Sequence, residues 1–358
     1  MKTTKVHELA DFNGKNIYVG IDLHKKDWSV TIYFDKIILK RFTQPGSVKS
    51  LAAFLKREYP NADYLCGYES GFCGFEVQRR LEELGIKCQV LHAADIPQTN
   101  KEKIEKTDRV DSRKIAKALS ESSGNSIYIP DRDNERDRNL IRYYLTLKKD
   151  TARAKNRIKS LLNSYYIEIP EQIGKNWSKN FIQWLKENEE VKDSARAALN
   201  LMISQLEHIR LVYLEATKEV RKLQNDPKHK KLMELLTSIT GIGPLIAIIL
   251  ITEIMDMKRF ENKRKLNSYV GLMPMEHSSG EQEHKGKITV KRNKFLRAKL
   301  IEAAWISIRH DPALSLAYHE LTKHMTGKRA ITRIARKLLN RIRCVWLNET
   351  VYQKNVTK

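Results

Sequence analysis

One carboxylate stands inside an apolar run near the N-terminus. Residues 17–24 are typical of a buried β-strand that contains Asp22, and a second apolar segment, residues 28–34, follows after three polar residues. Burying a carboxylate without a partner is costly, so such an acid pairs with a cation, a hydrogen-bond network or a metal. The two segments predict a hairpin with Asp22 near its closed end. A metal ligand and a turn residue bonded to backbone amides both fit this position.

Three further acids occur where they could join Asp22. Glu69 ends a short predicted strand, residues 64–68, and Asp108 and Asp111 lie three residues apart in a predicted helix. That spacing places both aspartates on the stripe that carries the apolar residues of the helix, so both are expected to point toward the sheet. An aspartate in the first turn of a helix can also do no more than complement the helix dipole.

Four converging carboxylates are suited to divalent cations. Mg²⁺ or Mn²⁺ takes oxygen ligands, and two such ions shared by carboxylates can stabilise the oxygens in phosphoryl transfer. The set Asp22, Glu69, Asp108 and Asp111 therefore predicts a metal-dependent site that acts on phosphate esters.

The elements around these acids predict an α/β domain of RNase H-like order. Apolar patterns predict three consecutive strands, a helix capped by Ser47, a fourth strand, a second helix and a fifth strand. In chain order these elements cover residues 16–22, 27–34, 37–43, 47–58, 64–68, 72–84 and 86–91. In such a layout the end of the fourth strand lies beside the centre of the first, so Glu69 is expected to face Asp22.

Composition points to a polyanionic partner. The 358 residues contain 66 Lys+Arg and 43 Asp+Glu, a net charge of +23, which favours nucleic acid, although a ribosome-associated or membrane-surface protein would carry the same total. No apolar run approaches the length of a bilayer span, and the N-terminus lacks the apolar core of a signal peptide. The four cysteines form no zinc-binding cluster. We therefore expect a cytoplasmic protein without a membrane segment.

The middle of the chain predicts two long helices. After a predicted linker, residues 124–137, apolar residues recur at heptad spacing from Leu140 to Tyr165 and again from Met202 to Leu223. The two helices could form a hairpin within one chain or pair with another subunit. The expected division of the chain is an α/β domain over residues 1–125, a linker with coiled-coil helices over 126–225, and an all-α domain over 226–350.

The C-terminal part carries two features of interest. Gly241 and Gly243 lie between two predicted helices, an arrangement similar to a helix-hairpin-helix, whose backbone N–H groups can bind a phosphate, and equally an ordinary tight turn. Further on, Ser278-Ser279-Gly280 is predicted to lie in a loop, where a serine before glycine is usually a turn residue. Basic residues follow this loop and recur in a final amphipathic helix, and they could contact phosphates or form a solvated face: Lys285, Lys287, Lys291, Arg292, Arg297, Arg333 and Arg336.

The motifs resemble those of one protein family. Asp22, Glu69 and residues 106–113, KTDRVDSR, resemble the DEDD tetrad and the KTDxxDA pattern in the RuvC-like domain of insertion-sequence-110 family transposases. Ser112 stands where alanine is usual. The pattern GLxPxxxSSG, then a basic stretch and FLRxxLxxAA, resembles the transposase domain of the same family, whose serine nucleophile falls on this dipeptide. We assign it to Ser279 and keep Ser278 in reserve.

The resemblance implies a DNA transposase. Ser279 would attack donor and target DNA to form a phosphoserine link, against the metal-binding carboxylates of another subunit in a dimer or tetramer, with a structured guide (bridge) RNA as partner. The family is also similar to the Piv-type DNA invertases, so site-specific inversion is the nearest alternative. A metal-dependent junction endonuclease would use the carboxylates alone, and a non-catalytic nucleic-acid-binding protein would need neither set.

Overall fold

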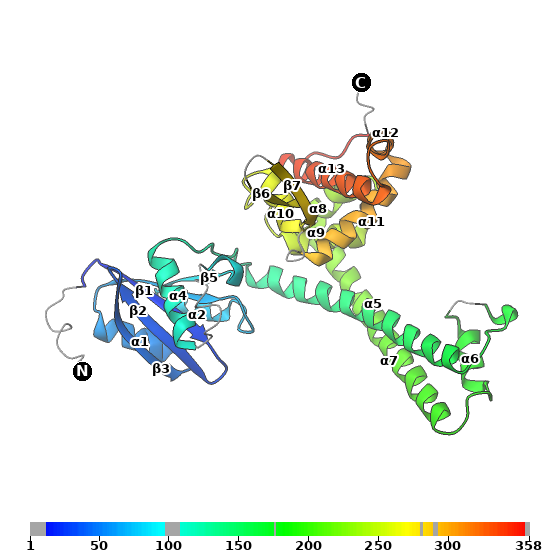
Figure 1. The fold of residues 1–358 in the computed structure, drawn as a ribbon, viewed down its shortest axis with the longest axis horizontal. Helices are drawn as coiled ribbons and strands as arrows, with labels where there is room; N and C mark the ends of the chain where they lie inside the picture. The colour runs from blue at the N-terminus through cyan, green and yellow to red at the C-terminus, as the bar shows by residue number, and fades with distance from the viewer. Residues whose placement is uncertain (1–11, 97–107, 175–176, 280–281, 289–292, 355–358) are drawn as a thin grey trace. The chain divides into compact units, whose positions relative to one another are not determined.

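The computed structural model describes residues 12–96, 108–174, 177–279, 282–288 and 293–354; for residues 94, 108–110, 274–279 and 282–288 it describes the backbone alone. The chain divides into two compact units, Met1–Ile129 and Pro130–Lys358, shown in Figure 1. No helix among the described residues has both the length and the apolar character needed to cross a bilayer.

A five-stranded mixed sheet forms the centre of the first unit. Its order is β3-β2-β1-β4-β5, with β1, β2 and β3 antiparallel and with β4 and β5 parallel to β1. The strands are β1 (Asn16–Leu23), β2 (Asp27–Phe34), β3 (Ile37–Pro45), β4 (Asp63–Glu69) and β5 (Lys87–Leu91). The predicted α/β character of this unit is confirmed.

Helices cover both faces of this sheet. Ile17, Val19 and Ile21 of β1 pack with α1 (Val48–Glu58) and α2 (Glu76–Glu83) on one face, while α4 (Asp108–Ser120) lies on the other. The expected cap is present, since the Ser47 side chain accepts a hydrogen bond from Ser50 N–H. The predicted start of α2 at residue 72 is wrong: Gly74 has a φ of 57°, which an α-helix does not accommodate, and the helix begins two residues later.

The predicted linker over residues 124–137 is also too long at both ends. Ser126 pairs with Leu91, and Ile127 N–H donates to the Val90 carbonyl, so these residues extend the edge of the sheet. The helix α5 (Arg132–Ser164) then begins directly after Asp131, whose side chain accepts from Asn134 N–H. Charged residues that resembled a linker therefore form the first turns of a helix.

Two long helices of the second unit pack against each other within the chain. The helices α5 and α7 (Asp193–Gln224) run antiparallel, with the Tyr144 and Tyr213 hydroxyls 2.9 Å apart and Arg157 bonded to Gln205. The turn between them carries η2 (Glu171–Ile173) and α6 (Lys179–Glu187), which close a small apolar core. The intramolecular hairpin is thus formed. Its buried stripe differs at the end of α5, where Leu162 is buried and Tyr165 is 50% exposed.

The remaining helices surround a second core in this unit. They are α8 (Pro227–Thr237), α9 (Pro244–Ile254), α10 (Lys263–Val270), α11 (Lys294–His310), α12 (Pro312–Thr322) and α13 (Gly327–Asn348). The helix α9 is buried along most of its length, which is typical of a helix that is apolar on all sides. The same core includes residues of α5 and α7, such as Tyr144 and Val220, so the helical hairpin and the C-terminal helices share one apolar interior.

Candidate active site

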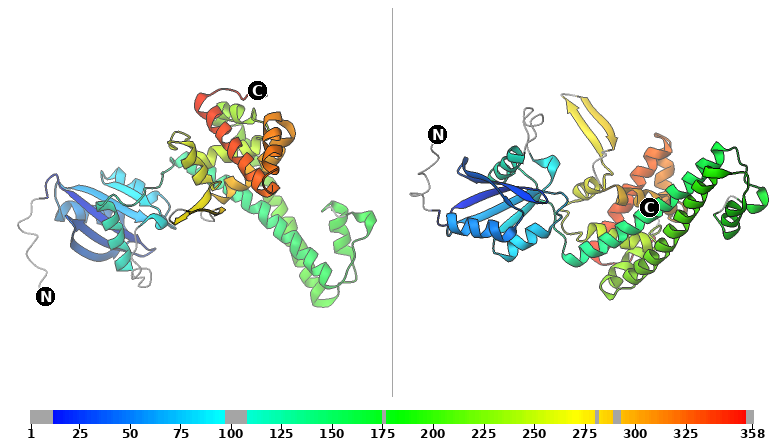
Figure 2. Two further views of the ribbon diagram at one scale, coloured as in Figure 1. Left: turned by 45° about the horizontal axis from the view of Figure 1, so that its top comes forward. Right: turned by 90° about the horizontal axis from the view of Figure 1, so that it is seen from below.

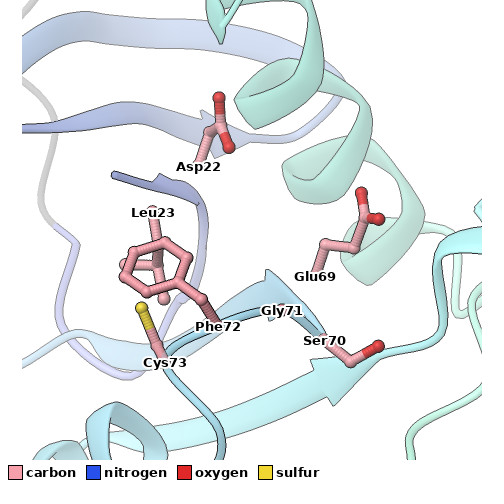
Figure 3. A pocket seen from close by; sticks show the side chains of 7 residues that line it. All are labelled: Asp22, Leu23, Glu69, Ser70, Gly71, Phe72 and Cys73. Atoms are coloured by element: carbon pink, nitrogen blue, oxygen red, sulfur yellow. The ribbon is translucent and has the colours of Figure 1, made fainter. Parts of the chain in front are cut away.

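The sheet brings Asp22 and Glu69 together. The strands β1 and β4 are parallel neighbours in a register that pairs Ile21 with Tyr68, so the next residues along the two strands are Asp22 and Glu69. Side chains alternate between the faces of a strand, and Ile21 and Tyr68 belong to the core beneath α1 and α2. The two acids therefore lie on the opposite face, the one that α4 covers. Figure 3 shows both carboxylates on this side.

Two glycines allow α4 to approach the sheet closely. A Cβ added at Gly20 of β1 would lie 2.0 Å from the Ser112 carbonyl oxygen, and one added at Gly67 of β4 would lie 2.9 Å from Leu119. The buried hydroxyls of Ser112 and Thr31 are 2.9 Å apart and join the helix to β2. At this position, where the KTDxxDA pattern has alanine, Ser112 forms a buried hydrogen bond. This contact holds the first turns of α4 over the strand that carries Asp22.

Asp111 lies at the edge of this contact. Its side chain is 37% exposed and accepts a hydrogen bond at 3.1 Å from the Lys114 ammonium, whose own side chain is 5% exposed. Ile115 and Leu119 are buried, as their stripe predicted. Asp108 is the first residue of α4, where only the backbone is described, and the preceding Thr107 lies outside the described residues.

An open cavity lies beside the first two acids. It has a volume of about 180 Å³ and is lined by Asp22, Leu23, Glu69, Ser70, Gly71, Phe72 and Cys73. His24 Nε2 lies 3.2 Å from Asp22 Oδ2. Two carboxylates with oxygen donors at one cavity are a suitable partial ligand set for a hard cation. Among the side chains that are described, however, no three acids, histidines or cysteines gather as a complete metal site.

The two candidate nucleophiles lie in a strand. β6 (Pro274–Ser279) and β7 (Gln282–Ile288) form an antiparallel hairpin in which Ser279 pairs with Gln282, and Figure 2 shows this hairpin extending away from the helices of its unit. The predicted loop around Ser278 and Ser279 is therefore wrong. The turn of a hairpin has the same glycine and polar residues as a long loop, so local composition did not distinguish them.

The expected nucleic-acid ligands differ in their surroundings. Arg333 is exposed, whereas Arg336 is half-buried, donates to the Leu272 carbonyl at 2.8 Å and has a pKa lowered by burial. Arg297 contacts the Gly271 carbonyl at 3.5 Å. Lys285 and Lys287 lie in β7, described by its backbone alone, and Lys291 and Arg292 lie outside the described residues.

The two glycines before α9 also differ. Gly241 has a φ of 91°, and a Cβ added there would lie 2.3 Å from Ser307 Oγ, so close packing on α11 is sufficient to require glycine. Gly243 is exposed at the start of α9, with open space around its α-carbon.

Several contacts of the site were not predicted. His24 and Lys114 bond the acids Asp22 and Asp111, and Phe72 and Cys73 line the cavity. The spacing of Lys114, three residues after Asp111, was a local signal for an ion pair. The Thr31–Ser112 bond joins residues that are 81 positions apart, and no local pattern predicts such a pair.

Comparison with known proteins agrees with these motifs. Residues 19–167 match a DEDD family model described as a transposase, and residues 233–320 match the model of the transposase IS116/IS110/IS902 family. The chain is 25% identical to the transposase for insertion sequence element IS1533 of Leptospira borgpetersenii, over 81% of this chain and 85% of that protein. Two Sinorhizobium fredii proteins, y4qE and y4rJ, are 26% and 27% identical, over 86% and 90% of this chain and 75% and 90% of their own lengths.

The match over residues 19–167 assigns the mixed sheet and the start of the helical unit to a transposase domain of the DEDD type. The chain belongs to the IS116/IS110/IS902 family of transposases, which are enzymes that act on DNA.

Proposed function

We propose that this transposase cuts and rejoins DNA through a covalent serine intermediate, with the acids of the first unit as metal ligands. The observation that carries the proposal is the placement of Asp22 and Glu69 at one cavity and on the sheet face that is covered by α4, the helix that also contains Asp108 and Asp111. The strand order β3-β2-β1-β4-β5 supports an RNase H-like, RuvC-like domain.

Asp22, Glu69, Asp108 and Asp111 would hold Mg²⁺ or Mn²⁺. Such ions supply charge neutralisation at the phosphate oxygens. The protein's own contribution is to keep the carboxylates in place, through the glycine contacts of α4 and through the Lys114 ion pair that orients Asp111. A carboxylate restrained by packing and hydrogen bonds loses less entropy when it binds its ligand.

Ser279 would supply the nucleophile. Its hydroxyl oxygen forms a bond to the phosphorus of a DNA backbone phosphate as the bond to the 3′-oxygen breaks. The serine proton is lost and a 3′-hydroxyl is released. The phosphoserine ester keeps the bond energy, so a 3′-hydroxyl can attack it to restore a phosphodiester and the free serine without ATP. Recombination requires this reversibility, which hydrolysis by water does not provide.

The charge of the protein is suited to several nucleic-acid strands at once. We propose donor and target DNA as substrates, a structured guide RNA as partner, and phosphate contacts by Arg333, Lys285, Lys287 and the helix-hairpin-helix-like turn at Gly243. The net charge of +23 is the support from this chain.

Purification with nucleic acid retained is expected to yield a discrete RNA encoded beside the gene. If only mixed cellular RNA co-purifies, RNA guidance does not apply and DNA is recognised directly.

The alternative is a junction endonuclease that uses the carboxylates and water. The two mechanisms are separated by incubating the wild-type protein with labelled DNA and Mg²⁺, denaturing it, and resolving the products. We expect label on the protein, because the serine mechanism passes through an ester. We expect none in excess EDTA, because EDTA removes the metal that the carboxylates are proposed to hold. Cleaved DNA without labelled protein, under conditions that trap intermediates, would support the endonuclease. A Piv-type inversion gives the same adduct but an invertible segment beside the gene.

A further inference from the structure

Glu253 of α9 is a carboxylate in the core of the second unit, with 1% of its surface exposed. Arg142 of α5 donates to both of its oxygens, from Nε at 2.6 Å and from Nη2 at 2.8 Å. Asn293 donates a third hydrogen bond, from Nδ2 to Oε2 at 2.7 Å. A buried carboxylate is tolerated when it is paired and its lone pairs are satisfied. The hydrogen bonds to Glu253 raise the pKa of Arg142.

Glu253 also contacts both ends of the segment that carries β6 and β7. Tyr269, near the end of α10, donates its hydroxyl to the Glu253 carbonyl at 2.9 Å. Asn293 follows β7, and its backbone N–H donates to the Tyr269 carbonyl at 3.3 Å, while its side-chain oxygen caps α11 at Leu296 N–H. Residues 269 and 293 are therefore joined to each other, and both are joined to Glu253, Tyr269 through the Glu253 backbone carbonyl and Asn293 through the Glu253 carboxylate.

The hairpin amplifies any movement of this base. β6 has six residues from Pro274 to Ser279, which at about 3.3 Å per residue places the serine about 17 Å from the start of the strand. A rotation of about 5° at the base would move the serine by about 1.5 Å on the same strand geometry. A displacement of about 1 Å can cost about 100-fold in rate. The direction of the hairpin must therefore be fixed at its base.

We propose that Glu253, through Arg142, Tyr269 and Asn293, is a positioning residue that sets the direction of the serine hairpin. The inference rests on the proposed role of Ser279 as nucleophile. It assigns Glu253 no contact with DNA: its carboxylate acts through Asn293, and its backbone carbonyl acts through Tyr269.

The test variant is Glu253→Gln. Its amide has one acceptor oxygen where the carboxylate has two, so in either orientation its NH₂ group faces a donor, Arg142 Nε or the pair Arg142 Nη2 and Asn293 Nδ2. Arg142 is 41% exposed, so water can solvate the released guanidinium and the unit is expected to fold. We expect the rate of covalent adduct formation to fall about 100-fold. DNA binding should stay within about twofold, because surface cations dominate it.

A second readout does not depend on activity. Trypsin cuts after Lys285 and Lys287 in β7 when the hairpin opens, and we expect this cleavage to be about tenfold faster in Glu253→Gln, since proteolysis follows the open population. The double variant Glu253→Gln/Asn293→Asp exchanges the amide and the carboxylate. Aspartate still caps α11 and now accepts from the new amide, so both readouts should return to within about threefold of wild type.

Asp311→Asn is the matched control. Asp311 is 2% exposed and also accepts three hydrogen bonds, from Arg341, Tyr352 and Leu314 N–H, in the same unit. Its loss should lower the melting temperature without changing the cleavage after Lys285 and Lys287 or the adduct rate. This separates local release of the hairpin from general destabilisation.

Wild-type rates of trypsin cleavage and adduct formation in Glu253→Gln would overturn the proposal. If the wild-type protein forms no adduct, the serine mechanism fails, and the trypsin comparison alone decides whether Glu253 holds the hairpin. If Glu253→Gln shows no cooperative melt, Asn293→Ser decides in its place, because it removes the amide that donates to the carboxylate and keeps a side chain that can cap α11. Faster cleavage in that variant supports the proposal, and an unchanged rate overturns it.

Discussion

Asp22→Asn is expected to abolish DNA strand exchange while the protein stays folded. The substitution keeps the size of the side chain and removes a charge at a cavity rather than in the core, where 22% of the Asp22 side chain is exposed. Losing about 4 kcal/mol of charge stabilisation at the phosphate corresponds to about 1,000-fold in rate. The measurement is strand exchange against Mg²⁺ concentration, with the melting temperature determined by circular dichroism.

Asp27→Asn is a suitable control for this variant. Asp27 begins β2 at the same closed end of the hairpin, is exposed, and does not line the cavity, so exchange should remain at the wild-type rate. Asp111→Asn should behave like Asp22→Asn. An unchanged rate in Asp111→Asn would remove that residue from the site, and wild-type exchange in excess EDTA would contradict the metal-dependent mechanism as a whole.

Ser279→Ala should lose the covalent DNA–protein adduct completely and keep its affinity for nucleic acid. A hydroxyl contributes little to a contact dominated by Lys and Arg, whereas in the proposed mechanism the Ser279 hydroxyl is the group that forms the ester. Binding and cleavage should therefore separate in this variant. The measurement compares labelled protein after denaturation with the dissociation constant for the same DNA at one salt concentration.

Ser278→Ala provides the control, because it makes the same change in the preceding residue of β6. We expect its adduct to form at the wild-type rate. An adduct that persists in Ser279→Ala and disappears in Ser278→Ala would place the nucleophile one residue earlier.

Mixing Asp22→Asn with Ser279→Ala extends the comparison, since a site built from two subunits regains one intact copy in a mixed oligomer. Inactivity of the mixture would place serine and carboxylates in the same subunit.

The local sequence determined the elements that carry the acids. The apolar run over residues 17–24 predicted the strand that carries Asp22, and this strand is present as β1. Capping residues such as Ser47, and the apolar stripe through Ile115 and Leu119, predicted helices that are present. These signals are readable because they depend on neighbours within one or two turns. The family motifs were likewise contiguous strings.

Only the tertiary structure determined how these elements meet. The contact of Gly20 with α4, the buried pair of Thr31 and Ser112, and the inward contact of Arg336 join segments far apart in the chain. Whether a polar residue is solvated or buried depends on which distant backbone covers it, and local pattern carries no such information. Glu253 shows this most clearly: within α9 it is one acid at the end of an apolar run, and its donors lie 111 and 40 residues away. Its hydrogen-bonding partners Arg142 and Asn293, and not the apolar run around it, determine how this carboxylate is held.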